Sequence, residues 1–414
     1  MYKLFHNVSQ IVTCSKFDLG ILNGKTSGKL SICVDEVGNI KEINETEELI
    51  AKYSYENLFD CKGGSIIPGF VDAHTHPVWA GDRVHEFEMK LAGASYLEIH
   101  NAGGGIHFSV DATTKASEIS LEMSLKKRLM GMLQHGTTTV ECKTGYGLLW
   151  ETERKMLQVL TNMKKCLPID ISITFLPAHA IPKNSSSWQH TKDIVDNQIP
   201  KLKQCLISNE LECNNIDVFC EKGIFEIEET KQILEAGKEI GLNINAHADE
   251  LFPLGGTEMI AKLKAKAVSH LEEISKEGIK SLKEHGTTAV LLPTTAYLLS
   301  LKPPPVQDMI KRGVRCALGS DFNPNAFCLS MPIVMNLACV LYKMSMNEAL
   351  LGATINGAYA LGMEHRVGSL EIGKQADFLV LNETNWQHII YQFGQSRDII
   401  KFVVKKGNIV LFNN

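Results

Sequence analysis

Residues 66–77 read Ile-Ile-Pro-Gly-Phe-Val-Asp-Ala-His-Thr-His-Pro, a short apolar run that ends in two histidines. Side chains at positions i and i+2 share one face of a β-strand, so His74 and His76 can point the same way from the end of a buried strand. Imidazole nitrogens suit Zn and Fe, and two of them on one rigid strand lose little entropy when a cation binds. The stretch therefore predicts a metal-binding strand end, although two polar loop histidines beside a Pro-Gly turn are the simpler alternative.

Three further apolar runs also end in ionisable side chains. Residues 242–250 end in a cluster that contains His247 and Glu250, residues 265–271 carry His270, and residues 314–321 end in Asp321. Helical patterns separate these runs, as they do in a chain of alternating strands and helices. The carboxyl ends of parallel barrel strands converge on one face and build the active site there, so we expect these side chains to meet.

A site formed by His74, His76, His247 and Asp321 would offer three neutral nitrogens and one carboxylate. Such a set leaves room for water, which distinguishes a catalytic metal from a closed structural one. A bound cation would lower the pKa of that water to about 7, giving hydroxide near neutral pH, and would polarise a carbonyl group. The four residues therefore predict hydrolysis of an amide or an amidine-like bond.

Three of the ionisable side chains are candidates for proton transfer. Glu250 or His270 could take the proton from water, and Asp321 is placed to hand a proton to a departing nitrogen. Taken alone, Glu250 is more simply interpreted as a carboxylate at a helix start, and His270 as a hydrogen-bonded histidine of the core. The sequence leaves both alternatives open.

Composition excludes several other classes of protein. The formal net charge is −5, and no face-sized run of Lys and Arg appears, so a nucleic-acid surface is not expected. No apolar stretch approaches the roughly 20 residues that a membrane span needs. The amino terminus lacks the pattern of a secretory signal, and the 11 cysteines include no Cys-x-x-Cys pair. We expect a protein of the cytoplasm that binds neither nucleic acid nor membrane.

Two kinds of pattern divide the 414 residues. The ends, residues 1–66 and 365–414, show short β-like runs separated by turns, whereas strands alternate with helical patterns between them. The predicted fold class is α/β: a (β/α)8 TIM-like barrel over residues 67–364 with a small β-sandwich domain formed by both termini. Within the barrel we expect a helix over residues 113–135, and the terminal strands include residues 30–34, 376–381, 399–404 and 407–411.

A few side chains near the predicted strand ends could choose a substrate. Arg83 follows the two histidines, and its guanidinium could bind a substrate carboxylate at two points, although an ion pair with Asp82 or Glu86 is equally compatible. Tyr146 and His179 follow other strands and suit the wall of a pocket that holds a planar polar ring. The glycines at 103–105 are typical of a mobile lid, because the spacing of a nucleotide-binding loop is absent.

Eight segments together carry a resemblance to a known family. The chain is similar to the imidazolonepropionases, which belong to the amidohydrolase superfamily, and the resemblance covers nearly the whole sequence. His-x-His alone indicates only the superfamily, whereas KTGYGL, LPAHAIP and AHADE are much more specific. The matching segments are PGFVDAHTHPVWAGDR, AGGGI, KTGYGL, LPAHAIP, DVFCEKGIF, NAHADE, VSHLEE and LGSDFNPN.

This resemblance implies hydrolysis of 4-imidazolone-5-propanoate to N-formimino-L-glutamate in histidine degradation. It implies one divalent or trivalent metal ion per chain, Zn or Fe, on the ligand set above, with His270 helping Glu250 to activate the bound water. It also implies a homodimer and a small substrate that carries a carboxylate. The substrate contacts it implies are Arg83, Tyr146, His179, Glu250, Asn323, Asn325 and Ala326. Some bacterial relatives have Gly followed by Ser or Thr at positions 325–326, which puts side-chain contacts there in doubt.

Three rival functions keep the same barrel. Another amidohydrolase, such as a cyclic-imide hydrolase or a nucleobase deaminase, would use the same two histidines on a different ring. A site with two metals would need a carboxylated Lys143 to bridge them, which nothing in the spacing requires. A scaffold that had lost its chemistry should also have lost ligands, and every proposed ligand is present.

Overall fold

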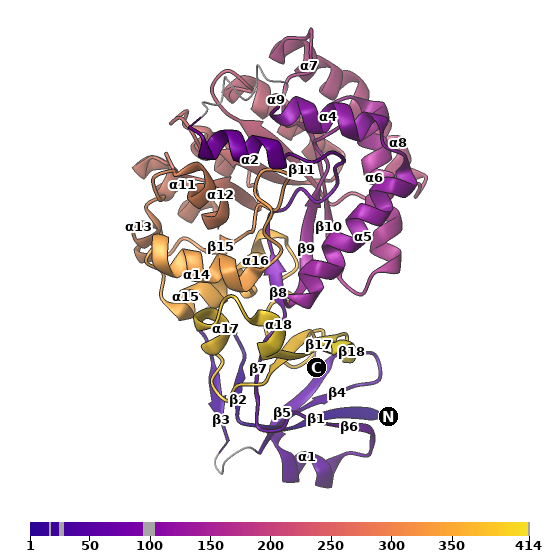
Figure 1. The fold of residues 1–414 in the computed structure, drawn as a ribbon, viewed down its shortest axis with the longest axis vertical. Helices are drawn as coiled ribbons and strands as arrows, with labels where there is room; N and C mark the ends of the chain where they lie inside the picture. The colour runs from indigo at the N-terminus through magenta and orange to yellow at the C-terminus, as the bar shows by residue number, and fades with distance from the viewer. Residues whose placement is uncertain (16–17, 25–28, 94–103, 413–414) are drawn as a thin grey trace.

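The computed structural model describes residues 1–15, 18–24, 29–93 and 104–412. Figure 1 shows a helix-rich barrel above a smaller β-rich part that contains both chain ends. Among the helices of these described ranges, none combines the length and the apolar character that a membrane crossing needs.

Eight parallel strands form the barrel, in the order of the chain. Most of their residues are buried because helices cover the outer face of the sheet while side chains fill the inside. The first and last strands meet through a bridge between Thr75 and Phe322, and the N–H of Asp321 donates to the carbonyl of His74 at 3.0 Å. The strands are β8 (Phe70–Asp72), β9 (Thr137–Lys143), β10 (Asp170–Ala178), β11 (Asn215–Cys220), β12 (Asn243–Ala248), β13 (Ala267–His270), β14 (Thr288–Leu291) and β15 (Cys316–Leu318).

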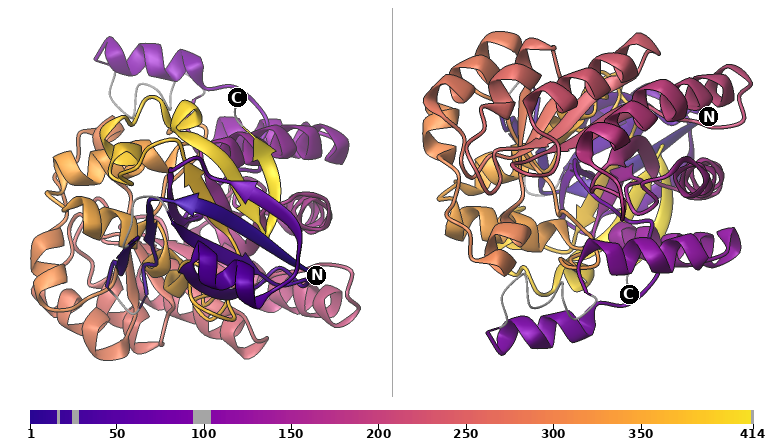
Figure 2. Two further views of the ribbon diagram at one scale, coloured as in Figure 1. Left: turned by 90° about the horizontal axis from the view of Figure 1, so that it is seen from below. Right: turned by 90° about the horizontal axis from the view of Figure 1, so that it is seen from above.

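Helices surround this barrel on its outer face, as the view from above in Figure 2 shows. Most present one apolar stripe to the strands; in α5, for example, Leu121, Leu125 and Leu129 recur every four residues and are buried. The helices between the strands are α2 (Val84–Leu91), α4 (Ile106–Lys115), α5 (Glu118–Gln134), α6 (Trp150–Cys166), α7 (Ser187–Asp193), the π-helical turn η1 (Ile194–Gln198), α8 (Ile199–Ile207), α9 (Ile227–Glu239), α10 (Gly256–Lys262), α11 (Lys276–His285), α12 (Pro293–Leu299) and α13 (Val306–Lys311), and those after β15 are α14 (Met331–Leu341), α15 (Met346–Gly352) and α16 (Ile355–Ala360).

The terminal segments form two sheets that pack face to face. Phe5 and Phe378, one from each sheet, meet edge to face with ring centroids 4.8 Å apart. A shared core of buried apolar residues fills the space between the sheets, as in a β-sandwich. One sheet has β5 (Ile40–Glu45), β4 (Leu30–Val34), β1 (Tyr2–Val8) and β6 (Tyr55–Asp60); the other has β18 (Asn408–Phe412), β17 (Ile400–Lys405), β16 (Phe378–Leu381), β7 (Ser65–Pro68), β2 (Gln10–Val12) and β3 (Ile21–Asn23).

The predicted fold class is confirmed: an α/β barrel stands beside sheets built from both termini. The domain boundaries at residues 66/67 and 364/365 stay a prediction, and β7 (Ser65–Pro68) runs across the first of them. Three short helices belong to the terminal part: α1 (Thr46–Lys52), α17 (His388–Tyr391) and α18 (Ser396–Ile399).

One predicted helix is wrong in its extent. The stretch 113–135 is two helices, because α4 ends at Lys115 and the hydroxyl of Ser117 accepts the N–H of Ser120 to begin α5. A serine in this position satisfies an N–H group that has no partner within the helix, and so favours a new start there.

Candidate active site at the carboxyl ends of the barrel strands

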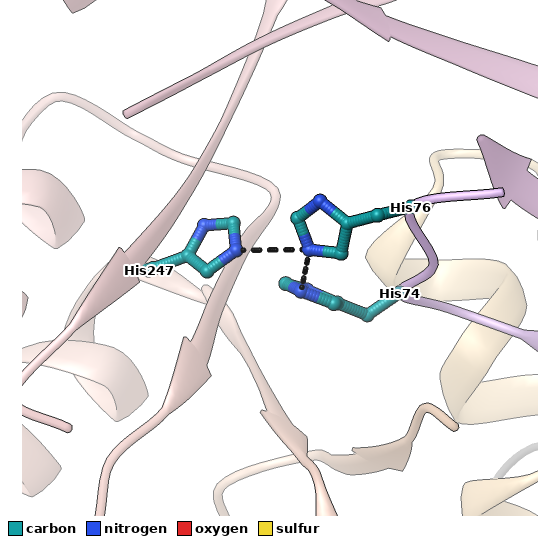
Figure 3. A group of neighbouring side chains, drawn as sticks. All are labelled: His74, His76 and His247. Atoms are coloured by element: carbon teal, nitrogen blue, oxygen red, sulfur yellow. Dashed lines mark hydrogen bonds between the residues drawn. The ribbon is translucent and has the colours of Figure 1, made fainter. Parts of the chain in front are cut away.

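Three histidines from two barrel strands meet inside the barrel mouth. His74 and His76 follow β8, and His247 lies on β12; all three are buried. Nε2 of His76 is 3.2 Å from Nε2 of His74 and 3.3 Å from Nε2 of His247, as the dashed lines in Figure 3 show. The three side chains offer one nitrogen each within 4.8 Å of one another. The structure therefore brings His247 next to His74 and His76, as the sequence led us to expect.

The outer nitrogens of two of these rings are held by hydrogen bonds. Nδ1 of His247 donates to Oδ1 of Asp217 at 2.9 Å, because a carboxylate can only accept, and this leaves the lone pair of Nε2 pointing inward. Nδ1 of His74 is 2.8 Å from the hydroxyl of Ser269. Burial, together with the nearby Lys143 ammonium, holds the pKa of His74 well below its usual value, so the ring is neutral.

Neutral nitrogens that face one another at this distance fit a metal ion. Two lone pairs repel unless a proton or a cation lies between them, and a divalent cation suits all three at once. Asp321 adds a fourth donor: its Oδ1 lies 3.5 Å from Nε2 of His74 and 3.4 Å from Nε2 of His76. Three nitrogens and one carboxylate oxygen thus lie close together; that all four hold a metal ion stays a prediction.

The loop that carries Asp321 is tied to β8. Asp72, the last residue of β8, accepts the N–H of Ser320 at 2.9 Å and its hydroxyl at 2.6 Å. Oδ2 of Asp321 accepts the hydroxyl of Thr295 at 2.5 Å, which leaves Oδ1 turned to the histidines. Asp321 itself has a φ of +47°, a conformation that non-glycine residues adopt at a cost and that is common at functional sites. Sequence reasoning missed Asp72, Thr295 and Ser320.

A buried charge network lies behind His247. Lys143 Nζ donates to Glu141 at 2.5 Å and to the other oxygen of Asp217 at 2.6 Å, and all three side chains are fully enclosed. Burial lowers the pKa of Lys143, but the two carboxylates outweigh this effect and raise it above its usual value. Carboxylation needs a neutral amine, so this pairing counts against a bridging lysine and a second metal.

Asp217 is a functional residue that sequence reasoning did not single out. It lies on β11 between the apolar Ile216 and Val218, and next to β12, which carries His247. An acidic side chain at an inward position of a buried strand was the available signal, because such charges are rarely buried without a partner.

Glu250 and His270 lie together at the edge of the cluster. Oε2 of Glu250 is 3.5 Å from Nε2 of His270. Burial raises the pKa of Glu250 well above its usual value, and Glu272 and Asp321 add to the effect; burial lowers the pKa of His270 to about 3. Within the described part of the chain, Nδ1 of His270 has no hydrogen-bond partner. His270 is therefore not a core histidine whose ring nitrogens are both hydrogen-bonded.

Two aromatic residues form a wall beside the histidines. The ring of His179 stacks on His76 with centroids 4.8 Å apart and planes 15° apart, and Tyr146 meets His179 edge-on at 5.3 Å. Nδ1 of His179 contacts the carbonyl of Gly145 at 3.0 Å, so the loop after β9 orients the ring. Tyr146 and His179 are thus placed against the proposed metal ligands, while their contacts with a substrate stay a prediction.

Arg83 makes the ion pair that the sequence left as an alternative. Its Nε and Nη2 donate to the two oxygens of Glu86 at 2.8 and 2.6 Å, whereas Asp82 instead accepts the N–H of Val84. Glu86 also accepts the N–H of Gly105 at 2.9 Å, which joins α2 to the segment before α4. Of the proposed lid at residues 103–105, Gly103 lies outside the described part of the chain and Gly104 and Gly105 are buried, so movement of this loop stays a prediction.

The loop after Asp321 is closed by its own polar groups. Asn323 donates from its side chain to the carbonyl of Asp321 at 2.7 Å and accepts the N–H groups of Asn325 and Ala326 at 2.7 and 3.1 Å. The side chain of Asn325 accepts from Lys90 of α2, and Ala326 is buried. The structure thus gives Asn323 a role in shaping the loop; contacts of these three residues with a substrate stay predictions.

A separate cavity of about 460 Å³ lies where β14 and β15 begin, at the other end of the barrel. Its lining includes Leu282, Val314 and Leu351, and none of the histidines of the cluster. Residues that act in catalysis gather at the carboxyl ends of barrel strands, so this cavity is not the candidate active site.

Comparisons with known proteins define the class. Residues 65–410 match the sequence model of the Amidohydrolase family, which covers the barrel together with β7, β16, β17 and most of β18. Among solved structures, the fold is similar to an adenosine deaminase from Xanthomonas campestris with bound zinc (TM-score 0.71, 17% identity, 99% of this chain and 93% of that one). It is equally similar to the guanine deaminase of E. coli (TM-score 0.71, 15% identity, 100% of both chains). At these identities the likeness concerns the fold alone.

Curated relatives are much closer in sequence. The chain is 53% identical to a "Probable imidazolonepropionase" of Xenopus tropicalis, over 99% of this chain and 97% of that one. It is 53% identical to the human protein with the same description, over 92% of this chain and 90% of that one, and 50% identical to that of Dictyostelium discoideum, over 99% and 97%. The chain therefore belongs to the imidazolonepropionases of the Amidohydrolase family and is a hydrolase.

Proposed function

We propose that this hydrolase opens the ring amide of 4-imidazolone-5-propanoate and forms N-formimino-L-glutamate, using one metal ion per chain. The observation that carries the proposal is the convergence of three imidazole Nε2 atoms and one carboxylate oxygen at the mouth of the barrel. The relatives described as imidazolonepropionases support the choice of substrate.

The proposed metal ligands are His74, His76, His247 and Asp321. A set of three neutral nitrogens and one oxygen accepts both Zn and Fe, so the supply of each metal decides which one is bound. When bound, such an ion lowers the pKa of water to about 7 and polarises a carbonyl oxygen.

The protein residues supply the proton transfers. Glu250 lies next to the cluster and is shielded from solvent, so its raised pKa makes it a stronger base than an exposed carboxylate. It would take the proton from water, with Nε2 of His270 beside it at 3.5 Å. Asp321, held by Thr295, would receive the second proton of that water and hand it to the departing ring nitrogen.

Arg83 is the proposed anchor for the substrate carboxylate. Its contacts with Glu86 use Nε and Nη2, so the two N–H groups on Nη1 lie outside that ion pair. Glu86 would fix the orientation of the guanidinium, and the carboxylate would bind on its Nη1 side. The stacked ring of His179 and the edge of Tyr146 would flank the imidazolone ring, and the loop of Asn323, Asn325 and Ala326 would cover it.

We also propose a homodimer in the cytoplasm. All 11 cysteines are free thiols in the structure, which is consistent with a reducing compartment. A monomeric mass by light scattering at micromolar concentration would contradict the dimer, and a signal confined to a membrane or organelle fraction would contradict the location.

The first test is ultraviolet loss of freshly made 4-imidazolone-5-propanoate. The purified chain should consume it rapidly, and a His247→Ala variant and a metal-stripped sample should both lose nearly all activity. Activity should return to the stripped sample when Zn or Fe is added back. If a sample with full metal content does not consume the compound, the proposed substrate is rejected and only the assignment to the family remains.

A second test concerns the carboxylate anchor. Arg83→Ala should raise KM for the imidazolone acid by tenfold or more, because a charged hydrogen bond is worth about 1.5–3 kcal/mol. Arg312→Ala is a matched control, since Arg312 pairs with Asp308 on an exposed helix face. A KM for Arg83→Ala equal to that of the control would remove Arg83 from the binding site.

A further inference from the structure

The imidazole of His270 lies between two glutamates. On one side its Nε2 is 3.5 Å from Oε2 of Glu250, the proposed base. On the other side its Nδ1 is 3.8 Å from Oε2 of Glu272, which follows β13 and turns its carboxyl group into the interior. Glu272 has no role in the reaction as described so far.

This inner side of His270 holds a group of buried polar atoms without hydrogen bonds. Among the described residues, no hydrogen-bond partner is found for Nδ1 of His270, for either carboxyl oxygen of Glu272 or for the hydroxyl of Tyr342. Buried polar atoms almost always have partners, and an ionised carboxylate enclosed in this way would be very costly. Glu272 is therefore held protonated: burial raises its pKa to about 8. A protonated carboxyl is a hydrogen-bond donor.

The state of Glu272 decides which nitrogen of His270 carries the proton. Burial raises the pKa of Glu250 as well, so the two glutamates compete for a proton, and the proposed base must be the ionised one. The carboxylate of Glu250 then needs a donor, and Nε2–H of His270 is the group that faces it. The neutral ring then has a lone pair on Nδ1, and a donor must face that lone pair from the inside. An ionised Glu272 would favour the opposite tautomer and turn the Nε2 lone pair against Glu250.

We propose that Glu272 is a positioning residue for hydrolysis: its carboxyl group donates to Nδ1 of His270 and thereby directs Nε2–H at Glu250. The separation of 3.8 Å is longer than a hydrogen bond, and contacts of this kind are often long before substrate binds and tighten in the complex. Glu272 acts through His270 and touches no reacting atom. The inference rests on the proposed function, in which Glu250 is the base.

Two substitutions of Glu272 test whether its side chain acts as a hydrogen-bond donor. Glu272→Gln retains an N–H donor of the same length, so its kcat should stay within about threefold of the parent protein. Glu272→Met keeps the length but removes the donor, so kcat should fall by about tenfold to a hundredfold while KM changes by less than about threefold, in line with loss of a proton-transfer contribution. Glu273→Met is the matched control, because Glu273 is the exposed neighbour and should behave as the parent protein.

The kinetic outcomes have opposite meanings. A Glu272→Met variant with the kcat of the control, or a Glu272→Gln variant as slow as Glu272→Met, would overturn the proposal. Zinc content and melting temperature are measured on every variant. If Glu272→Met fails to fold or to hold zinc, the comparison of Glu272→Gln with the parent and the tautomer measurement below decide the matter.

The tautomer itself gives a readout that does not depend on turnover. In the zinc-loaded protein with 15N-labelled histidine, the signal of His270 should show a proton on Nε2 and an accepting Nδ1, and Glu272→Gln should preserve this pattern. A proton on Nδ1 in the parent protein would overturn the inference. Failure of the parent protein to consume the imidazolone acid would instead reject the proposed substrate, and the tautomer would still test Glu272.

Discussion

At the scale of single residues, His247 depends on a partner that points away from the proposed metal. Asp217 accepts its Nδ1–H and is itself held by Lys143, so the carboxylate fixes both the tautomer and the ring orientation of the ligand. Such partners of metal-binding histidines also raise the basicity of the ligand. The geometry of the cluster is thus set partly by β11, a strand that contributes no ligand of its own.

Replacing Asp217 by Asn should therefore weaken metal binding. We expect the dissociation constant for zinc to rise by about tenfold to a hundredfold, because the neutral amide holds Nδ1–H less firmly. The constant can be measured by competition with a chelating dye. Asp308→Asn, on an exposed helix face, is the control. Equal zinc affinity in the two variants would show that Asp217 does not support His247.

Not every residue of this site could be predicted from sequence. His74, His76, His247 and Asp321 stand at the ends of apolar runs, and the barrel geometry brings such ends together. Thr295 and Ser320 carry no such signal: the hydroxyl of Thr295 donates to Asp321 and that of Ser320 donates to Asp72. Their roles depend on side-chain contacts that a pattern of strands and helices does not specify.

At the scale of elements, the loop after β9 holds the aromatic wall in place. Gly145 has a φ of +104°, and a Cβ there would lie 2.8 Å from Nδ1 of His179. The loop is further held by Glu153 of α6, whose carboxylate accepts the N–H groups of Gly145 and Gly147 at 3.1 and 2.8 Å. The position of His179 over His76 is therefore a property of this loop as much as of β10.

Gly145→Ala should displace His179 and lower kcat/KM by about tenfold or more. Gly241→Ala is a suitable control, since Gly241 also has a positive φ, +93°, but no heavy atom lies within 4 Å of the added Cβ. Both variants should lose stability through backbone strain, by about 1 kcal/mol. Only the first should lose activity at a temperature where both are folded. Equal kcat/KM in the two variants would show that the loop after β9 does not affect the activity of the site.

The elements themselves differed in how well they could be predicted. Leu30–Val34 is a strand as predicted, and β17 and β18 lie within a residue of their predicted bounds. The helix α1 in the terminal part was not expected, because seven residues are too few to show a helical period. Strands can be predicted from the local pattern of apolar residues, whereas short helices and helix breaks depend on single capping residues.

At the scale of the whole molecule, the buried Glu272 should make stability depend on pH. Its pKa rises from the usual 4.5 to about 8 on folding, so the folded protein keeps a proton that the unfolded chain has lost. The unfolded state binds fewer protons between these values, and stability attributable to this group falls as pH rises from 4.5 to 8. The effect reaches about 4 kcal/mol at pH 8.

Glu272→Gln removes this titration and leaves the other groups in place. The variant should therefore gain stability relative to the parent protein as pH rises, with the smallest difference near pH 5 and the largest near pH 8. Urea unfolding at several pH values measures the difference, and Glu273→Gln should show no trend. A difference between Glu272→Gln and the parent that is constant with pH would mean that Glu272 is ionised in the folded protein.

The barrel closes where its first strand meets its last, through Thr75 with Phe322 and through the carbonyl of His74 with the N–H of Asp321. About 250 residues separate the two sides of this seam, so a ribosome working at roughly 5–20 residues per second needs roughly 12 to 50 seconds to make the second side after the first. During that time the apolar β8 has no β15 to pair with. The nascent chain must stay unaggregated over this interval, and the four proposed ligands come together only when synthesis is nearly finished.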